Sequence, residues 1–142
     1  MKIDTSKIEG YAEMSAEDKL KALDALNRVG ILDKAYIRAD QLSGGQQQRV
    51  SLARALAQDA DILLADEPVA ALDPVTAREV MDDFKRINKE LNKTVLINIH
   101  HVELALEYTD RIIAVKKGRI VFDGPSSSVT QQVLDDVYRK EA

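Results

Sequence analysis

Residues 42–49 read LSGGQQQR and open a segment whose apolar spacing predicts a helix. Glycine has no side chain, so Gly44 and Gly45 let an anion approach the backbone closely. The N–H groups of Gly44, Gly45 and Gln46 fall at the helix start, where they have no acceptor within the helix. A helix start carries about half a positive charge, and the Ser43 hydroxyl adds a donor. This stretch predicts a phosphate site, although a serine cap and a glycine turn alone would give a similar pattern.

A second polar feature follows about twenty residues later. Residues 62–68 read ILLADEP, a short apolar strand that ends in two acids. A wholly apolar strand is typical of a parallel sheet covered on both faces. Its carboxyl end is the edge where α/β sheets bind ligands, so Asp66 and Glu67 are candidate site residues. The alternative is a pair of solvated acids at the end of a strand.

The two stretches together resemble the signature and Walker B motifs of ABC ATPases. Residues 71–73, Ala-Leu-Asp, resemble the D-loop of that family, and His100 follows the next predicted strand, as the switch histidine does. The motifs stand in the family order, within a resemblance that covers about residues 15–124. Asp73 before Pro74 is also a routine helix start, and both roles can hold together. His101 stands where the family commonly has aspartate, and its role is open.

The resemblance implies a role for each matching residue. Glu67 would orient and polarise the attacking water, and His100 would contact the γ-phosphate of ATP. Asp66 would help to hold Mg²⁺ through water. The nucleotide bound by a second subunit would be contacted by Ser43, Gly44, Gly45, Gln46 and Asp73.

Three further segments look most like the ATP-binding subunits of bacterial phosphonate importers. They are Arg38–Gln41, His100–Glu103 and Ile120–Gly124. Such a subunit would power uptake as one of two ATPase subunits bound to transmembrane permease subunits, peripheral on the cytoplasmic face of the membrane. Substrate choice in such importers lies with other subunits, so no residue here is expected to recognise a phosphonate.

The 142 residues contain no Gly-x-x-x-x-Gly-Lys-Ser/Thr sequence, the P-loop that cradles ATP phosphates. We therefore expect this chain to bind ATP weakly and not to turn it over alone, although the intact subunit would be an ATPase. Without a neighbouring P-loop strand, the Walker B strand should expose an apolar edge, and the chain should self-associate.

The predicted fold is α/β: part of an ABC-type P-loop NTPase domain, with a mostly parallel sheet flanked by helices and part of the helical subdomain. Residues 1–14 are unassigned, and 15–58 form the helical part with the signature. Residues 59–124 form the C-terminal part of a RecA-like core, and 125–142 a linker and a last helix, expected over about Val129–Lys140. Strands are expected over 62–65, 94–99, 111–115 and 119–122.

The composition argues against several classes of partner and site. The net charge is -4, so no overall basic field attracts nucleic acid, and no apolar run is long enough to span a bilayer. The chain has no cysteine, which excludes disulfides and thiolate metal sites. Two other interpretations stay open: the second lobe of a chromosome-maintenance or DNA-repair ATPase, and a non-catalytic assembly or regulatory module. The first should carry a long coiled coil, for which the helix after Ser15 is too short.

Overall fold

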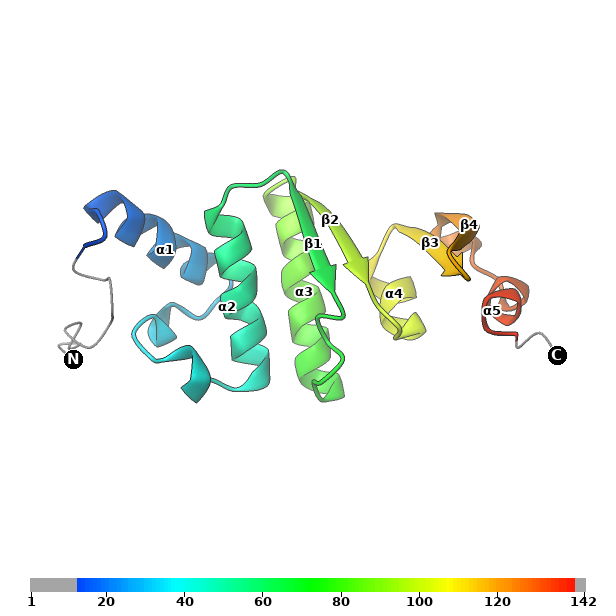
Figure 1. Cartoon of the computed structure of the whole chain (residues 1–142), viewed down its shortest axis with the longest axis horizontal. Helices are drawn as coiled ribbons and strands as arrows, with labels where there is room; N and C mark the ends of the chain where they lie inside the picture. Colours follow the sequence, from blue (N-terminus) through cyan, green and yellow to red (C-terminus); the bar gives the residue numbers. More distant parts are fainter. Residues whose placement is uncertain (1–12, 140–142) are drawn as a thin grey trace.

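The computed structural model describes residues 13–139, in which helices and strands alternate (Figure 1). The α-helices are α1 (Ala16–Arg28), α2 (Gly44–Ala57), α3 (Pro74–Glu90), α4 (Val102–Tyr108) and α5 (Gln131–Tyr138). The strands are β1 (Ile62–Asp66), β2 (Thr94–Asn98), β3 (Arg111–Lys116) and β4 (Arg119–Pro125). Short 3₁₀ turns cover Leu32–Lys34, Ala39–Gln41 and Ser126–Ser128.

The helices begin and end where their local chemistry predicts. The Ser15 hydroxyl accepts from the backbone N–H of Asp18 at 3.0 Å, which caps α1, and Gly30 follows that helix with a φ of +71°. The Asp73 carboxylate caps α3, and Pro74 fills its first position. These caps confirm the helix starts predicted after Ser15 and at Asp73–Pro74.

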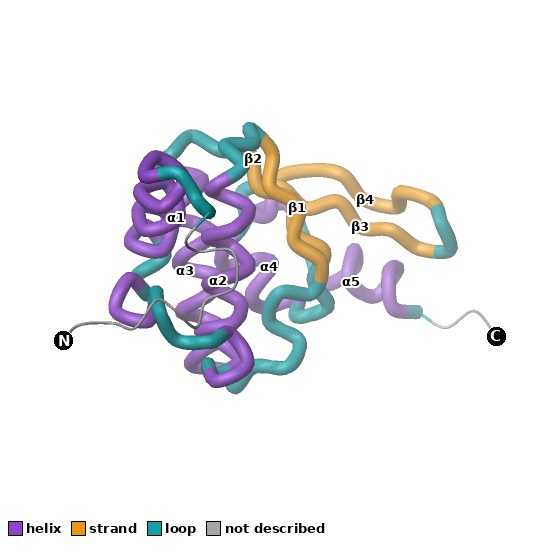
Figure 2. Tube along the Cα trace, turned by 60° about the vertical axis from the view of Figure 1, so that its left-hand side comes forward, coloured by secondary structure: helices purple, strands orange, loops and turns teal. Residues whose placement is uncertain are grey.

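Strands β1 and β2 form a parallel pair joined through α3, with Leu63 opposite Val95 and Asp66 opposite Asn98. Alternate side chains along a strand point to opposite faces. Leu63 therefore faces the helices and is 4% exposed, whereas its neighbour Leu64 faces away and is 76% exposed. Figure 2 shows α1, α2 and α3 gathered on one side of this pair.

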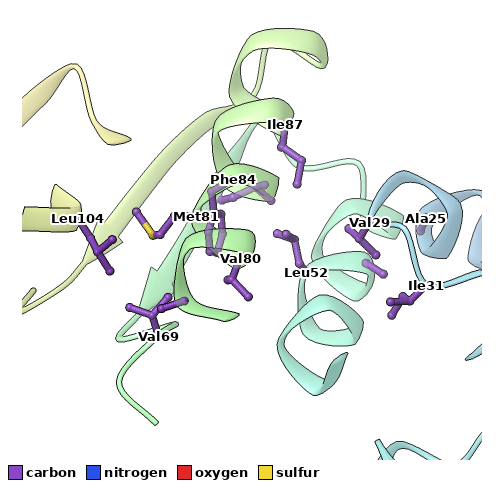
Figure 3. Packing of buried hydrophobic residues seen from close by; sticks show 13 residues of the cluster. Ala25, Val29, Ile31, Leu52, Val69, Val80, Met81, Phe84, Ile87 and Leu104 are labelled. Carbon is purple, nitrogen blue, oxygen red and sulfur yellow. The ribbon is translucent and has the colours of Figure 1, made fainter. Parts of the chain in front are cut away.

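One hydrophobic cluster joins the helices to the inner face of the β1–β2 pair (Figure 3). Met81 and Ile87 on α3 lie at its centre, almost without exposed surface. The cluster runs continuously from α1 to α4, so residues before and after position 58 share one core. Its buried members are Ala25, Val29, Ile31, Leu52, Ala53, Leu63, Val69, Ala77, Val80, Met81, Phe84, Ile87 and Leu104.

The sheet differs from the prediction in two respects. We expected β1 to be covered on both faces, but within residues 13–139 the outer face of the β1–β2 pair is open: Ile62 and Leu64 on β1 and Leu96 on β2 are all more than half exposed. The described strands also form two separate pairs, because β3 and β4 make an antiparallel hairpin that does not join β1–β2. Helices pack against only one side of β1–β2 in this part of the chain, which explains the open face.

The C-terminal elements also correct the prediction. The last helix is shorter than expected and begins only after Thr130, whose hydroxyl accepts from the backbone N–H of Val133. A 3₁₀ turn over Ser126–Ser128 occupies the space before it. The hairpin turns at Lys117 and Gly118, which both have positive φ, as a tight turn requires.

Within the described residues, no helix has both the length and the apolar character needed to cross a bilayer. Most of the unassigned segment 1–14 and the last residues of segment 125–142 lie outside the described range.

Candidate functional site

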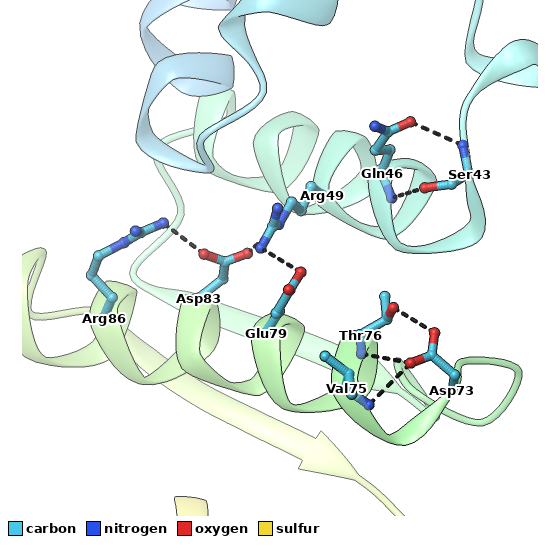
Figure 4. Close-up of polar contacts among 9 residues, drawn as sticks. All are labelled: Ser43, Gln46, Arg49, Asp73, Val75, Thr76, Glu79, Asp83 and Arg86. Carbon is cyan, nitrogen blue, oxygen red and sulfur yellow. Dashed lines mark hydrogen bonds and ion pairs between the residues drawn. The ribbon is translucent and has the colours of Figure 1, made fainter.

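The turn before α2 is held by its own side chains (Figure 4). The Ser43 hydroxyl accepts from the backbone N–H of Gln46 at 3.3 Å, and the Gln46 side chain accepts from the backbone N–H of Ser43 at 3.0 Å. This reciprocal pair is a capping box. The Gln47 side chain also donates to the Leu42 carbonyl at 3.0 Å. The turn is therefore fixed before any ligand arrives. We call residues 42–47 the signature turn.

This geometry changes one part of the sequence prediction. The backbone N–H of Gln46 was predicted to face a ligand, but the Ser43 oxygen already accepts it. Among the described residues, the backbone N–H groups of Gly44 and Gly45 have no acceptor. Two such amides at a helix start, with the Ser43 hydroxyl beside them, are the kind of donors that can bind an anion.

The two glycines also pack against the loop before α3. A Cβ atom at Gly44 would lie 3.2 Å from Leu72 Cδ2, and one at Gly45 would lie 2.3 Å from Thr76 Cγ2. The signature turn therefore rests on the start of α3. The neighbouring Asp73 accepts from the backbone N–H groups of Val75 and Thr76, both at 3.0 Å.

Asp73 also accepts from the Thr76 hydroxyl at 2.5 Å. These hydrogen bonds, above all that from the Thr76 hydroxyl, hold the pKa of Asp73 below its ordinary value. The carboxylate is thus engaged as the cap of α3 while it lies exposed beside the signature turn.

Further along both helices, a buried carboxylate links α2 to α3 (Figure 4). Asp83 is 5% exposed and accepts from Arg49 Nε at 2.7 Å and from Arg86 Nη2 at 2.7 Å. Burial raises the pKa of Asp83 above its ordinary value, although both guanidinium groups oppose that shift. Arg86 also donates to the Arg28 carbonyl at the end of α1. Three helices therefore meet at one charged centre.

The second part of the candidate site lies at the carboxyl ends of β1 and β2. His100 Nε2 lies 2.6 Å from Glu67 Oε1, and Asn98 Nδ2 donates to Asp66 Oδ1 at 2.7 Å. Glu67 has a φ of +50°, a left-handed conformation that is unfavourable for a residue with a side chain. Its backbone N–H donates to the Asn98 carbonyl at 2.9 Å, which holds this conformation in place. The fold thus brings Asp66, Glu67 and His100 to one edge.

The two histidines are separated by their surroundings. His100 contacts Glu67. His101 is the N-cap residue of α4, but its side chain is exposed and makes no capping hydrogen bond. In Figure 1 the starts of α2 and α3 lie at the lower end of the molecule, and β1 and β2 run downward toward that end. The elements that carry the predicted site residues therefore point toward one end of the molecule.

The residues at this edge meet some of the requirements of a magnesium site. No group of three or more histidine, aspartate or glutamate side chains in residues 13–139 is arranged to hold a metal by itself. Mg²⁺ keeps several waters and needs only one or two carboxylates together with phosphate oxygens. The exposed carboxylate of Asp66, oriented by Asn98, fits that lesser requirement.

Four residues with clear roles in this geometry escaped the sequence analysis: Asn98, Thr76, Arg49 and Asp83. Asn98 carried a usable signal, because it is the one amide at the end of an apolar strand parallel to the Walker B strand. The other three depend on how α2 packs on α3, which the motifs do not encode.

Comparison with known proteins agrees with this geometry. The family model described as ABC transporter matches residues 3–70, which includes most of the segment that the motifs left unassigned. The phosphonates import ATP-binding protein PhnC of Lactococcus lactis subsp. lactis is 81% identical over 93% of this chain. Its counterpart in Staphylococcus haemolyticus is 62% identical over 88% of the chain. This chain is similar to the ATP-binding proteins of ABC transporters.

Solved structures of ABC cassettes show the same architecture. An inward-facing ABC transporter of the metal-chelate type matches 94% of this chain with a TM-score of 0.84 at 24% identity, which supports the fold alone. A dimeric ATP-binding cassette bound to ADP and Pi matches 80% of the chain with a TM-score of 0.66 at 39% identity. The α/β fold predicted from the ABC motifs is thus confirmed as part of an ABC cassette.

The chain spans about half the length of the relatives it matches. It covers 54% of the Lactococcus lactis protein and 49% of the Staphylococcus haemolyticus protein, and it corresponds to their C-terminal half. It likewise covers 53% and 49% of the two solved chains. Two features therefore lie in the part of the chain that matches this half. They are the signature turn and the carboxyl ends of β1 and β2 with Asp66, Glu67 and His100, which we call the Walker B edge.

Proposed function

We propose that this chain forms the C-terminal half of the ATP-hydrolysing subunit of an ABC importer, with phosphonates as the transported class. The observation that carries the proposal is the presence of two features in the described residues. One is a preformed turn with the free amides of Gly44 and Gly45, and the other is the Glu67–His100 contact at the Walker B edge. The phosphonate assignment rests on the printed names of relatives that share up to about four-fifths of the aligned residues.

The signature turn would act on a nucleotide held by a second subunit. Gly44 and Gly45 would donate their amides to the terminal phosphate, and the Ser43 hydroxyl would add a third hydrogen bond. The side chain and backbone of Gln46 maintain the turn, which makes Gln46 a supporting rather than a donating group. Because these donors are already aligned, binding needs little ordering of the chain.

The Walker B edge would act on the nucleotide held by the same cassette. Glu67 would accept a hydrogen bond from the attacking water and polarise it, and His100 would orient Glu67 and contact the γ-phosphate. Bound Mg²⁺, held in part by Asp66, would supply charge neutralisation at the phosphates. Asp73 would complete the contact between subunits while it caps α3.

The partners follow from the two-part site. A second ATPase subunit must supply the other half of each nucleotide site, and transmembrane permease subunits would convert closure of the pair into transport. A dimeric cassette among the structural relatives supports the first of these partners. The working location would be the cytoplasmic face of the membrane, reached through the permease.

The 142 residues alone should bind ATP weakly. Three charge-assisted hydrogen bonds supply roughly 1.5–3 kcal/mol each, whereas association costs about 4–15 kcal/mol in lost freedom. The P-loop supplies most of the phosphate contacts in this class of ATPase, and the chain contains no such sequence. We expect a dissociation constant near 1 mM or weaker, on the order that such an energy balance allows.

Complementation tests the proposal. The chain is mixed with the P-loop-containing N-terminal half of the Lactococcus lactis relative, and ATP hydrolysis is measured with Mg²⁺. We expect hydrolysis that neither half shows alone and that Glu67→Gln abolishes. Glu90→Gln, at the exposed end of α3, is the matched control and should keep the activity. No hydrolysis from a complex that forms stably would overturn the proposed function.

The transported class needs a separate test in cells. A strain that lacks its phosphonate importer ATPase receives both halves, with a phosphonate as the only phosphorus source. Growth that depends on Glu67 supports phosphonate uptake. Restored ATPase activity without growth would show that the ATPase assignment is right and the phosphonate assignment is wrong.

A further inference from the structure

We propose that Thr76 is a positioning residue for the signature turn, and that residue 45 is glycine because the Thr76 methyl group occupies the space of a side chain there. A Cβ atom at residue 45 would lie 2.3 Å from Thr76 Cγ2, far inside normal contact, and Gly45 is buried. The role of Thr76 rests on the proposed function, because it acts by placing the turn that faces the phosphate.

Rotating the Thr76 methyl group away from Gly45 would break the hydrogen bond between the Thr76 hydroxyl and Asp73. That hydroxyl donates to Asp73 Oδ2 at 2.5 Å, and the Thr76 backbone N–H donates to Asp73 Oδ1 at 3.0 Å. A threonine side chain has few allowed rotamers, and the bond to Asp73 selects one of them. The methyl group is therefore held against Gly45 by the same carboxylate that caps α3.

A second contact between α2 and α3 keeps Gly45 next to Thr76. Arg49 lies one helical turn after Gly45, and Asp83 lies two turns after Thr76, so both pairs share the α2–α3 interface. The Arg49–Asp83 hydrogen bond of 2.7 Å prevents α2 from sliding or rotating away when the first contact is disturbed. The signature turn and the Asp73 loop should therefore move as one unit.

The usual explanation for a glycine beside a phosphate is that a side chain would block the ligand. The two explanations differ in what happens when the methyl group is removed. In Thr76→Ser the hydroxyl bond to Asp73 is kept, and the nearest remaining atom, Thr76 Cβ, lies 3.8 Å from the position of the added Cβ, an ordinary contact. An internal clash should then disappear, whereas a clash with a phosphate should persist.

The test is a double-mutant cycle in the 142-residue chain, read by thermal unfolding in far-UV circular dichroism. Gly45→Ala should lower the melting temperature by several degrees, about the shift expected for overpacking. Combined with Thr76→Ser, the alanine should cause no loss, because alanine is the better helix former. Gly44→Ala is the matched control and should cost less, because it meets only the flexible end of Leu72 at 3.2 Å.

The second reading is complemented ATP hydrolysis, at a temperature where every variant is folded. Gly45→Ala should lower the rate about tenfold, and the double variant should return to within about threefold of Thr76→Ser. An equal loss in Gly45→Ala with and without Thr76→Ser in the melting cycle would overturn the packing claim. Rescue in melting without rescue in hydrolysis would overturn the positioning claim.

The failure of the proposed function would look different. If the wild-type mixture does not hydrolyse ATP, the proposed function is wrong, but the melting cycle still decides whether Thr76 explains the glycine.

Discussion

The two halves of the candidate site are built in different ways. The signature turn stands on α2, whose inner face lies in a closed core and whose polar contacts end on α3. The Walker B edge stands on a two-stranded sheet with a buried inner face and an open, apolar outer face. Within residues 13–139 the signature turn is thus supported by packing on both α2 and α3, whereas the Walker B edge stands on a sheet with one uncovered face.

The polar groups of the signature turn are already held in place, whereas those of the Walker B edge are more exposed. The capping box, the Asp73 cap and the Arg49–Asp83 bond are all satisfied within the described residues. Glu67 and His100 contact each other, but the His100 side chain is 76% exposed, and Glu67 itself has an unfavourable left-handed backbone conformation. We therefore expect changes on the helical side to reduce stability, and changes on the outer face of the sheet to affect association.

The largest expected contrast uses two adjacent leucines of β1. Leu63→Ala removes a side chain that is 4% exposed and should lower the free energy of unfolding by about 2–5 kcal/mol. Leu64→Ala, at 76% exposed, should change it by no more than about 0.5 kcal/mol. Urea unfolding measures both. Equal losses would show that the outer face is covered in solution and would remove the contrast.

A second contrast concerns the charged centre between the helices. Asp83→Ala should cost about 1–3 kcal/mol, because it leaves Arg49 and Arg86 without their buried acceptor. Glu79→Ala removes a half-exposed partner that lies 3.5 Å from Arg49 and should cost about 0–1 kcal/mol. The same unfolding assay compares them. A loss for Glu79→Ala as large as that for Asp83→Ala would contradict the central role of Asp83.

The open face predicts self-association. Exposed Ile62, Leu64 and Leu96 lie together on one side of a sheet whose β1 strand, within the described residues, pairs only with β2. Sedimentation velocity should show mass that increases with concentration, and Leu64→Lys should reduce that increase. A monodisperse monomer at high concentration would contradict this prediction. The complementary half should compete with self-association.

The smallest expected effect concerns how the free energy of unfolding depends on pH. It compares Asp73, which caps α3, with Asp83, which lies within α3. Hydrogen bonds lower the pKa of Asp73. Asp73 therefore stabilises the fold at pH values above the ordinary aspartate pKa of about 4, and this stabilisation is lost as the pH falls toward the lowered pKa. The pKa of Asp83 is raised by burial, so its contribution decreases as the pH rises from about 4 through the raised value. The two therefore have opposite signs.

Unfolding at a series of pH values tests these signs. Asp73→Asn should flatten the loss of stability on the acid side, and Asp83→Asn should remove a decline on the side above pH 4, roughly where an ordinary aspartate titrates. Slope changes of the same sign in both variants would contradict the assignment of the two environments.

The sequence predicted the helices and strands better than the contacts between them. Helix caps such as Ser15 and Asp73 act locally, so the helix starts could be inferred and are confirmed. The motifs also led to Glu67 and His100, which the fold brings within 2.6 Å. Their catalytic roles stay predictions.

The contacts that escaped prediction depend on packing between helices distant in sequence. Arg49 and Asp83 are 34 residues apart, and nothing in either motif signals their pairing. The fit of Gly45 against Thr76 needs coordinates, because the glycine has an adequate explanation in phosphate binding. The Gln46 amide was misjudged for a similar reason: a capping box is visible in the sequence, but its completion by Ser43 removes a donor.

The central claim is that the Gly44 and Gly45 amides face a phosphate held by another molecule. The most direct measurement follows the backbone amide resonances of the chain by NMR, with the complementary half added first without and then with Mg·ATP. We predict that nucleotide shifts the Gly44 and Gly45 resonances while that of Leu56, at the far end of α2, stays in place. A complex that forms and binds ATP but leaves both glycine amides unchanged would contradict the account.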